Sequence, residues 1–136
     1  MKKTIIDMHG IVKSFYIGTP NELEILHGIN ITVKEGEFVS IVGQSGSGKS
    51  TLMNIIGALD RATRGSYMLD GVPIGICDDK RLSEIRNKKI GFVFQTFNLI
   101  SRTSALKNVD LPILYSGVSK AERTRRAKEL LDLVEM

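Results

Sequence analysis

The fold of this chain is decided by one stretch, Gly43-Gln44-Ser45-Gly46-Ser47-Gly48-Lys49-Ser50-Thr51. The stretch follows a short apolar run over residues 38–42 and leads into a second apolar run over residues 52–56. That order predicts a buried strand, a glycine-rich loop and a helix that begins where the loop ends. The spacing fits Gly-x-x-x-x-Gly-Lys-Ser/Thr, the pattern of a phosphate-binding loop.

The residue types in this loop are those that binding a polyphosphate requires. Several backbone N–H groups must converge on the phosphates, and Gly43, Gly46 and Gly48 remove side chains that would block the approach. The helix expected from Lys49 adds unpaired N–H donors and the positive end of its dipole. Lys49 supplies a charge for the β- and γ-phosphates, and the Ser50 hydroxyl can ligate Mg²⁺. The residues expected to hold the nucleotide phosphates are Gly43, Gln44, Ser45, Gly46, Ser47, Gly48, Lys49, Ser50 and Thr51.

Composition and length are those of an ordinary globular protein. The 136 residues are 42% hydrophobic and 25% charged. A chain of this length buries about two-thirds of its unfolded surface. The net charge of +4 is mild and does not by itself indicate nucleic-acid binding. The single cysteine, Cys77, cannot form an internal disulfide, which favours a reducing compartment and predicts no disulfide partner.

The sequence contains no run with the features of a secretion signal or a membrane span. Residues 1–7 hold too few apolar side chains for a signal peptide. No other run approaches the roughly 18 apolar residues that a span requires. We therefore expect a soluble, cytoplasmic protein whose association with a membrane depends on a partner.

Upstream of the glycine-rich loop, the pattern predicts antiparallel strands. Residues 4–8 indicate a first strand, and residues 23–33 alternate well enough for another strand with a kink at Gly28. Glu35-Gly36 predicts a tight turn into the strand over residues 38–42.

Directly after the loop, the pattern changes to helices and short strands. The helix that begins near Lys49 is expected to end at Gly57. Residues 65–69 indicate a short strand, which the Asp70-Gly71 pair turns back. Asp78-Asp79 then begins a further helix, with acidic residues in its first turn and basic residues in its last.

The last third of the chain is expected to be mostly helical. Residues 90–94 first predict an apolar strand that ends at Gln95, a position that suits either a ligand contact or an ordinary strand-end cap. Residues 99–115 combine a short helical pattern with a proline. Ser119 and Glu122 then form a capping box at the start of an amphipathic helix.

Together, several of these stretches resemble the ATP-binding subunit of an ABC transporter. The stretches that carry the resemblance are Tyr16, Gly43–Thr51, Leu52–Gly57, Leu59-Asp60-Arg61 and Phe92-Val93-Phe94-Gln95. The likeness is greatest to the macrolide-exporter and lipoprotein-releasing branch, through residues 52–65 and 86–92. It covers essentially the whole chain, and the combination is more specific than the phosphate loop alone.

The resemblance implies an α/β fold of the P-loop NTPase class. An antiparallel β subdomain and part of a mainly parallel core sheet with helices would form an ATP-binding core over residues 1–95. Residues 96–136 would then begin the helical subdomain. In the family, a transmembrane permease subunit docks on that subdomain and a second nucleotide-binding domain completes a dimer. The resemblance therefore places the protein at the inner face of the cell membrane, held there by its permease partner.

The resemblance also implies roles for individual residues. An aromatic residue near the N-terminus stacks on adenine in this family, and Tyr16 matches it best, with Phe15 as the second choice. Gln95 matches the glutamine that meets Mg²⁺ and the attacking water. The implied cofactors are ATP and Mg²⁺, with Lys49 and Gln95 as catalytic residues and with Ser50 and Gln95 as metal contacts.

Three motifs of the family do not occur in these 136 residues. They are the Leu-Ser-Gly-Gly-Gln signature, the strand ending in Asp-Glu that carries the catalytic base, and a histidine downstream of Gln95. Their absence indicates the N-terminal part of the domain, and we expect this stretch alone to have negligible ATPase activity. The predicted strands over residues 38–42 and 90–94 would then lack the neighbours that pair with their edges.

Three other functions fit the sequence less well. A GTPase or a nucleotide kinase shares the loop, but the sequence has neither an Asn-Lys-x-Asp base-reading motif nor an arginine-rich lid. A short, non-catalytic nucleotide-binding or regulatory remnant that is complete at residue 136 is the remaining alternative. The basic helix over residues 120–128 lacks the interleaved aromatics of a nucleic-acid binder.

Overall fold

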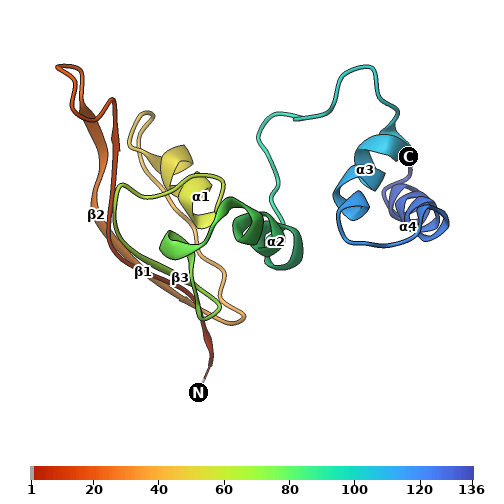
Figure 1. Cartoon of the computed structure of the whole chain (residues 1–136), viewed down its shortest axis with the longest axis horizontal. Helices are drawn as coiled ribbons and strands as arrows, with labels where there is room; N and C mark the ends of the chain where they lie inside the picture. Colours follow the sequence, from red (N-terminus) through yellow and green to blue (C-terminus); the bar gives the residue numbers. More distant parts are fainter. Residues whose placement is uncertain (1) are drawn as a thin grey trace. The chain divides into compact units, whose positions relative to one another are not determined.

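The computed structural model describes residues 2–136, which form two compact units. One unit extends to Ile90, and the other is Gly91–Met136. The first contains all the strands of the described residues and two α-helices, and the second contains two α-helices (Figure 1). The antiparallel strands and helices agree with the predicted fold class.

The first unit is built on an antiparallel sheet of four strands in the order β2-β1-β3-β4. The strands are β1 (Thr4–Phe15), β2 (Leu23–Lys34), β3 (Arg64–Leu69) and β4 (Val72–Pro73). β1 is longer than the predicted strand over residues 4–8. Its register shifts after Met8 against β2 and after His9 against β3, and its pairing with β2 then continues to Phe15. At this irregularity, Gly65 packs so closely that a Cβ there would lie 2.4 Å from the Gly10 carbonyl oxygen.

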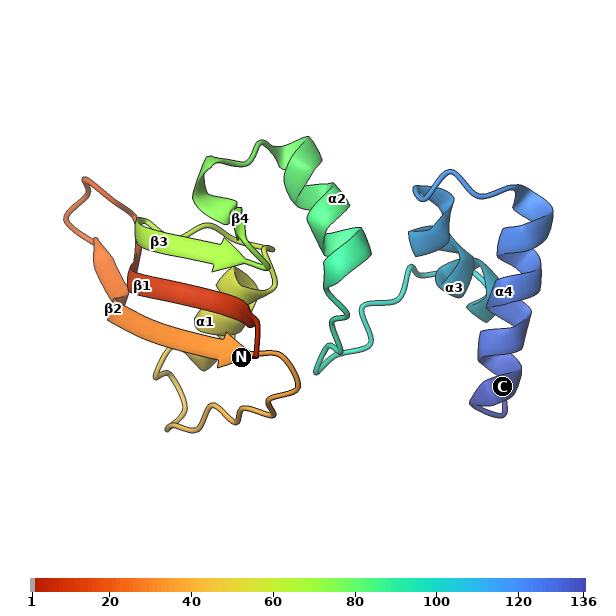
Figure 2. The ribbon, with the colours of Figure 1, turned by 90° about the horizontal axis from the view of Figure 1, so that it is seen from below.

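Helix α1 (Lys49–Ile56) covers one face of this sheet, as the views in Figures 1 and 2 both show. The short helix η1 (Ile74–Ile76) and α2 (Asp79–Lys89) follow β4. The Tyr67 hydroxyl of β3 donates a hydrogen bond to the Ile56 carbonyl at the end of α1, at 2.7 Å. Burial raises the pKa of Tyr67 above its usual range. The core side chains are Met8, Ile11, Leu26, Leu52, Ile55, Ala58, Tyr67, Leu69, Ile74, Leu82 and Ile85.

The start of α1 approaches the sheet at Gly48, whose backbone has a φ of +90°. A Cβ on Gly48 would lie 2.9 Å from Leu26 Cδ2 and 3.0 Å from Ile25 Cγ2, both on β2. Leu26 is only 3% exposed, so it has little room to move. Gly48 therefore serves two demands, a left-handed backbone and close packing against β2.

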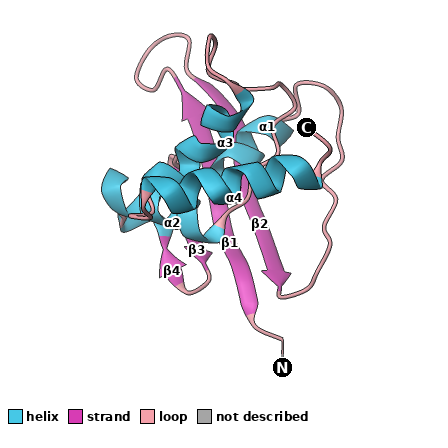
Figure 3. Ribbon diagram, turned by 90° about the vertical axis from the view of Figure 1, so that its right-hand side faces the viewer, coloured by secondary structure: helices cyan, strands magenta, loops and turns pink. Residues whose placement is uncertain are grey.

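Two predicted strands, over residues 38–42 and 90–94, do not form among the residues that the structure describes. Figure 3 draws the whole connection between β2 and α1 as loop. Phe38 is 97% exposed and Val93 is 96% exposed. A strand is stabilised by hydrogen bonds to a neighbour, and no described strand lies beside either run. The strands predicted over residues 38–42 and 90–94 are therefore wrong for these residues.

The β3–β4 turn is joined to two other elements through Asp70. The Asp70 carboxylate pairs with Lys3, next to the start of β1, and with Lys89, at the end of α2. Asp70 and Gly71 have φ values of +48° and +77°, as the Asp-Gly sequence predicted. The ammonium groups of Lys3 and Lys89 lower the pKa of Asp70 to about 2.

The second unit packs α3 (Ala105–Leu114) against α4 (Lys120–Leu133). The hydroxyl oxygens of Ser104 and Ser119 each accept a hydrogen bond from the backbone N–H three residues on, so both helices are capped. Arg123 of α4 donates to the Asp110 carboxylate of α3 at 2.9 Å. None of the helices within residues 2–136 is long and apolar enough to cross a membrane.

The Asp70 ion pairs predict a pH-dependent stability. A carboxyl group with a folded-state pKa of about 2 and an unfolded-state value near 3.9 stabilises the fold above pH ~4, and this contribution is lost as pH falls through about 2. We expect Asp70→Asn to lower the melting temperature at pH 7, because asparagine keeps the turn conformation but loses the charge. The difference from the wild type should shrink between pH 4 and pH 2 in thermal unfolding followed by circular dichroism.

Glu84→Gln is the matched control for this substitution. Glu84 forms one exposed ion pair with Arg81 on α2, and such a surface pair contributes little. Equal melting temperatures for Asp70→Asn and the wild type at pH 7 and low salt would contradict the role given to Asp70.

Gly48 and Gly46 offer a second test of the fold. Both have a positive φ, so alanine at either position costs about 1–2 kcal/mol in backbone strain. Only at Gly48 would the added methyl also meet β2, at a further cost of about 1–3 kcal/mol, because the Gly46 Cβ position has no atom within 4 Å. Gly48→Ala should therefore lower the free energy of unfolding, measured by urea denaturation, more than Gly46→Ala. An equal loss would show that the approach to β2 is not tight.

Candidate functional site

The glycine-rich loop forms a closed turn ahead of α1. The Ser47 N–H donates to the Gln44 carbonyl oxygen at 3.2 Å, and Gly46 and Gly48 both have positive φ values. A Cβ on Gly43 would lie 2.7 Å from Ser47 Oγ, so a side chain at this position would require the Ser47 hydroxyl to move. The three glycines predicted from the spacing therefore have conformational or steric reasons in the structure.

The Lys49 side chain folds back over this loop. Its Nζ donates to the carbonyl oxygens of Gly43 at 2.7 Å and Gln44 at 2.5 Å, and to Ser47 Oγ at 3.3 Å. The ammonium is thus held at the centre of the turn by neutral oxygens of its own loop. Phosphate oxygens would compete well for it, because they carry a negative charge that attracts the ammonium and the carbonyl oxygens are neutral.

The start of α1 adds a positive electrostatic potential to the loop. The Leu52 N–H donates to the Gly48 carbonyl at 2.9 Å as the first bond of the helix, so the N–H groups of residues 49–51 have no partner inside it. The first turn carries no acidic residue that would neutralise the dipole. Lys49, the helix N-terminus and the glycine-rich backbone together form a site suited to an anion with several oxygens.

The metal contact that the motif predicts at the loop is the Ser50 hydroxyl, in the first turn of α1. Within residues 2–136, no group of three or more His, Cys, Asp or Glu side chains could hold a metal ion. One hydroxyl fits Mg²⁺, which is usually bound through few protein ligands together with substrate phosphates and water. It does not fit a metal that needs a complete set of protein ligands.

An aromatic pair lies where β1 ends. Phe15 is the last residue of β1 and is 37% exposed, and Tyr16 begins the following turn and is 70% exposed. Tyr16 has a φ of +55°, which is uncommon for a residue with a side chain. Its carbonyl oxygen accepts hydrogen bonds from the Thr19 N–H at 3.1 Å and from Thr19 Oγ1 at 2.7 Å.

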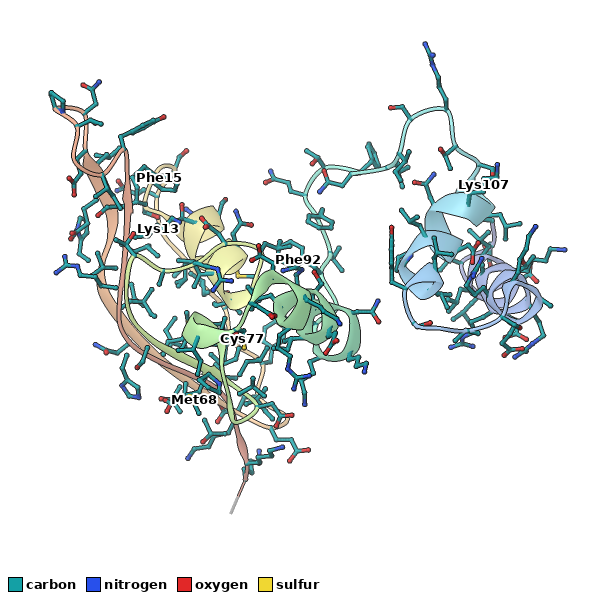
Figure 4. All side chains as sticks on the ribbon, in the orientation of Figure 1. Lys13, Phe15, Met68, Cys77, Phe92 and Lys107 are labelled. Carbon is teal, nitrogen blue, oxygen red and sulfur yellow. The ribbon has the colours of Figure 1, made fainter. Side chains whose placement is uncertain are left out.

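The strand register brings this aromatic pair close to the phosphate loop. Gly48 packs on Leu26 of β2, and Leu26 is the residue that pairs with Lys13 of β1. Phe15 lies two residues beyond Lys13, or roughly 7 Å along a strand. Figure 4 shows Lys13 and Phe15 on the side of the sheet toward α1. The loop and the aromatic end of β1 therefore lie at the same end of the β1–β2 ribbon.

Gln95 lies outside the unit that contains the loop. It belongs to the second unit, where it is exposed and lies at a bend after residues 90–94. The strand predicted to end at Gln95 is absent among the described residues, as noted above. The structure thus brings together the predicted residues Gly43 to Thr51 and the β1 end with Tyr16, while the roles given to Gln95 stay predictions.

Sequence reasoning missed Lys13 as a residue of this region. Its ammonium lies over the Phe15 ring, 5.1 Å from the centroid, and donates to Asp60 Oδ1 at 2.8 Å. The sequence did contain a signal for this contact. Residues i and i+2 of a strand face the same side of the sheet, and Lys13 precedes Phe15 by two positions. The pattern alone does not distinguish such a lysine from a solvated one.

Comparison with known proteins agrees with this geometry. The family model described as ABC transporter matches residues 26–136. An ABC transporter ATP-binding protein of Bacillus subtilis strain 168, YknY, is 51% identical over 130 residues, which are 96% of this chain and 56% of the relative. The macrolide export ATP-binding/permease protein MacB of Campylobacter fetus is 51% identical over 127 residues, which are 93% of this chain and 20% of that protein.

A solved structure is similar over the same region. It is the dimeric post-hydrolysis state of the ATP-binding cassette MJ0796 bound to ADP and phosphate, with a TM-score of 0.87 and 44% identity. The match covers 97% of this chain and 58% of that one, so the chain spans somewhat more than half the length of this cassette. By sequence and by structure, this chain belongs to the ABC transporter family, within the ATP-binding domain of the macrolide-exporter branch.

Proposed function

We propose that the loop over residues 43–51 binds the phosphates of MgATP. The observation that carries this proposal is the position of the Lys49 ammonium, which the Gly43 and Gln44 carbonyls hold over the loop at the N-terminus of α1. Incoming phosphate oxygens would replace those carbonyls as its partners and accept hydrogen bonds from the loop N–H groups. Ser50 would contribute its hydroxyl to Mg²⁺, and the ion would supply charge neutralisation between the β- and γ-phosphates.

The adenine base would stack on the aromatic end of β1. Tyr16 was the sequence-based choice for this contact and Phe15 the second. The geometry favours Phe15, because its ring lies on the α1 side of the sheet and is fixed by Lys13, while Tyr16 belongs to the turn. A purine presents a flat π face, so either ring can cover it.

In the complete protein, the bound ATP would be hydrolysed and the energy used for transport. Gln95 is proposed to orient Mg²⁺ and the attacking water, in line with the family pattern. The partners we propose are a transmembrane permease and a second nucleotide-binding domain. They are supported by the MacB name, which combines ATP-binding with permease, and by the dimeric state of the cassette MJ0796. The permease would hold the protein at the inner face of the membrane.

The helical unit over residues 91–136 is proposed to begin the subdomain that meets the permease. Several of its apolar side chains are exposed, and they are Phe97, Leu99, Ile100, Leu114, Tyr115, Leu133 and Val134. The family match makes a non-catalytic remnant the less favoured reading. Guanine-specific or kinase chemistry has no supporting feature in the site described above.

The first test replaces the lysine. Lys49→Ala removes a charge-assisted contact to phosphate, so the dissociation constant for MgATP should rise about tenfold to a hundredfold. The change would be measured by calorimetric titration of the full chain. Lys80→Ala, at an exposed position of α2, is the matched control and should bind as the wild type does. Unchanged MgATP affinity in Lys49→Ala would refute the phosphate site.

The second test compares the two aromatics. Loss of a base-stacking ring typically costs about 1–3 kcal/mol, so Phe15→Ala should weaken ATP binding about tenfold. Binding of inorganic tripolyphosphate, which has no base, should not change. We expect Tyr16→Ala to have the smaller effect on ATP. A larger loss of ATP affinity in Tyr16→Ala than in Phe15→Ala would instead assign the base contact to Tyr16. If neither change weakened ATP binding, adenine would not bind at this end of β1.

A further inference from the structure

The Lys13 side chain is almost enclosed, with 12% of its surface exposed. Its Nζ donates to Asp60 Oδ1 and to the Arg61 carbonyl oxygen, both at 2.8 Å. The same ammonium lies 5.1 Å from the centroid of the Phe15 ring. These contacts join the end of β1 to the loop that follows α1.

This set of contacts leaves Lys13 poorly suited to bind a ligand itself. An ammonium has three donors, two of which are taken by oxygens, and its charge is directed at an aromatic face. A cation over a ring is attracted to the π face, more strongly where water is excluded. The contact therefore restrains the Phe15 ring and occupies one of its faces.

A second connection holds the same short segment. The Ser14 N–H donates to Thr63 Oγ1 at 2.9 Å, and the Thr63 N–H donates to the Val12 carbonyl at 2.8 Å. Residues 60–63 thus hold residues 12–15 from one side. The helix whose N-terminus meets the phosphate loop leads directly into the segment that fixes the aromatic end of β1.

From this geometry we infer that Lys13 is a positioning residue for the nucleotide base. It holds the Phe15 ring with one face covered by the ammonium and leaves the opposite face for adenine. Asp60 and the Arg61 carbonyl keep the ammonium in place, so the position of the ring depends on the loop after α1. This inference rests on the proposed function, since it concerns the base of the same ATP.

If Lys13 positions the base, its substitution should weaken the binding of ligands that contain a base and leave the binding of ligands without a base unchanged. Lys13→Met keeps the length of the apolar stem but removes the charge and both donors. We expect the dissociation constant for ATP to rise about three- to tenfold. The dissociation constant for inorganic tripolyphosphate should stay within about twofold of the wild-type value, because Lys49 and the loop are unchanged. A general loss of stability would not produce such a split at a temperature well below unfolding.

Two further variants make the test specific. Lys13→Arg keeps a cation and donors over the ring, so it should restore most of the affinity for ATP. Lys34→Met makes the same substitution at an exposed lysine at the far end of β2 and should leave both ligands unaffected. All four proteins would be titrated with ATP and with tripolyphosphate as the full 136-residue chain.

The outcomes separate this inference from the proposed function. Weaker ATP binding with unchanged tripolyphosphate binding in Lys13→Met, rescued by Lys13→Arg, supports the inference. If Lys13→Met binds ATP as the wild type does, or loses both ligands equally, Lys13 has no positioning role and the phosphate site still stands. If the wild-type chain binds neither ligand, the proposed function and this inference fail together.

Discussion

The structure depends on the close approach of backbone to side chain at Gly48. At this residue the chain takes a left-handed conformation and begins α1 directly against Ile25 and Leu26 of β2. Only a residue without a Cβ satisfies both demands without strain. The approach sets where the N-terminus of α1 lies and, with it, where Lys49 and Ser50 are presented. A requirement of packing thereby becomes the geometry of an anion site.

The two ends of α1 serve different parts of the proposed nucleotide site. Its N-terminus presents the phosphate loop, and the segment after its C-terminus binds Lys13 and residues next to it on β1. Tyr67 also holds the C-terminal end of α1 to β3 through its hydroxyl. One short helix, anchored at both ends, therefore relates the phosphate-binding residues to the aromatic end of β1. On the proposed function, this is how a small unit would hold both the phosphates and the base of ATP.

Much of this arrangement could be predicted from local chemistry. The glycine spacing predicted the loop and the start of α1, and the Asp70-Gly71 pair predicted the β3–β4 turn. The capping box of Ser119 and Glu122 predicted the start of α4. Prediction failed for residues 38–42 and 90–94, because a strand depends on a neighbouring strand as well as on its own apolar side chains. Lys13 was missed for a related reason, since its partners Asp60 and Arg61 are 47 and 48 residues away in the sequence.

The central claim is that residues 43–51 form a nucleotide phosphate site. The most direct measurement is a titration of the ¹⁵N-labelled chain with MgATP, followed through the backbone amide resonances. If the N–H groups of the loop and of the first turn of α1 bind phosphate oxygens, their resonances should show the largest shifts. Saturable shifts centred on other residues, or no shifts at millimolar MgATP, would contradict the account.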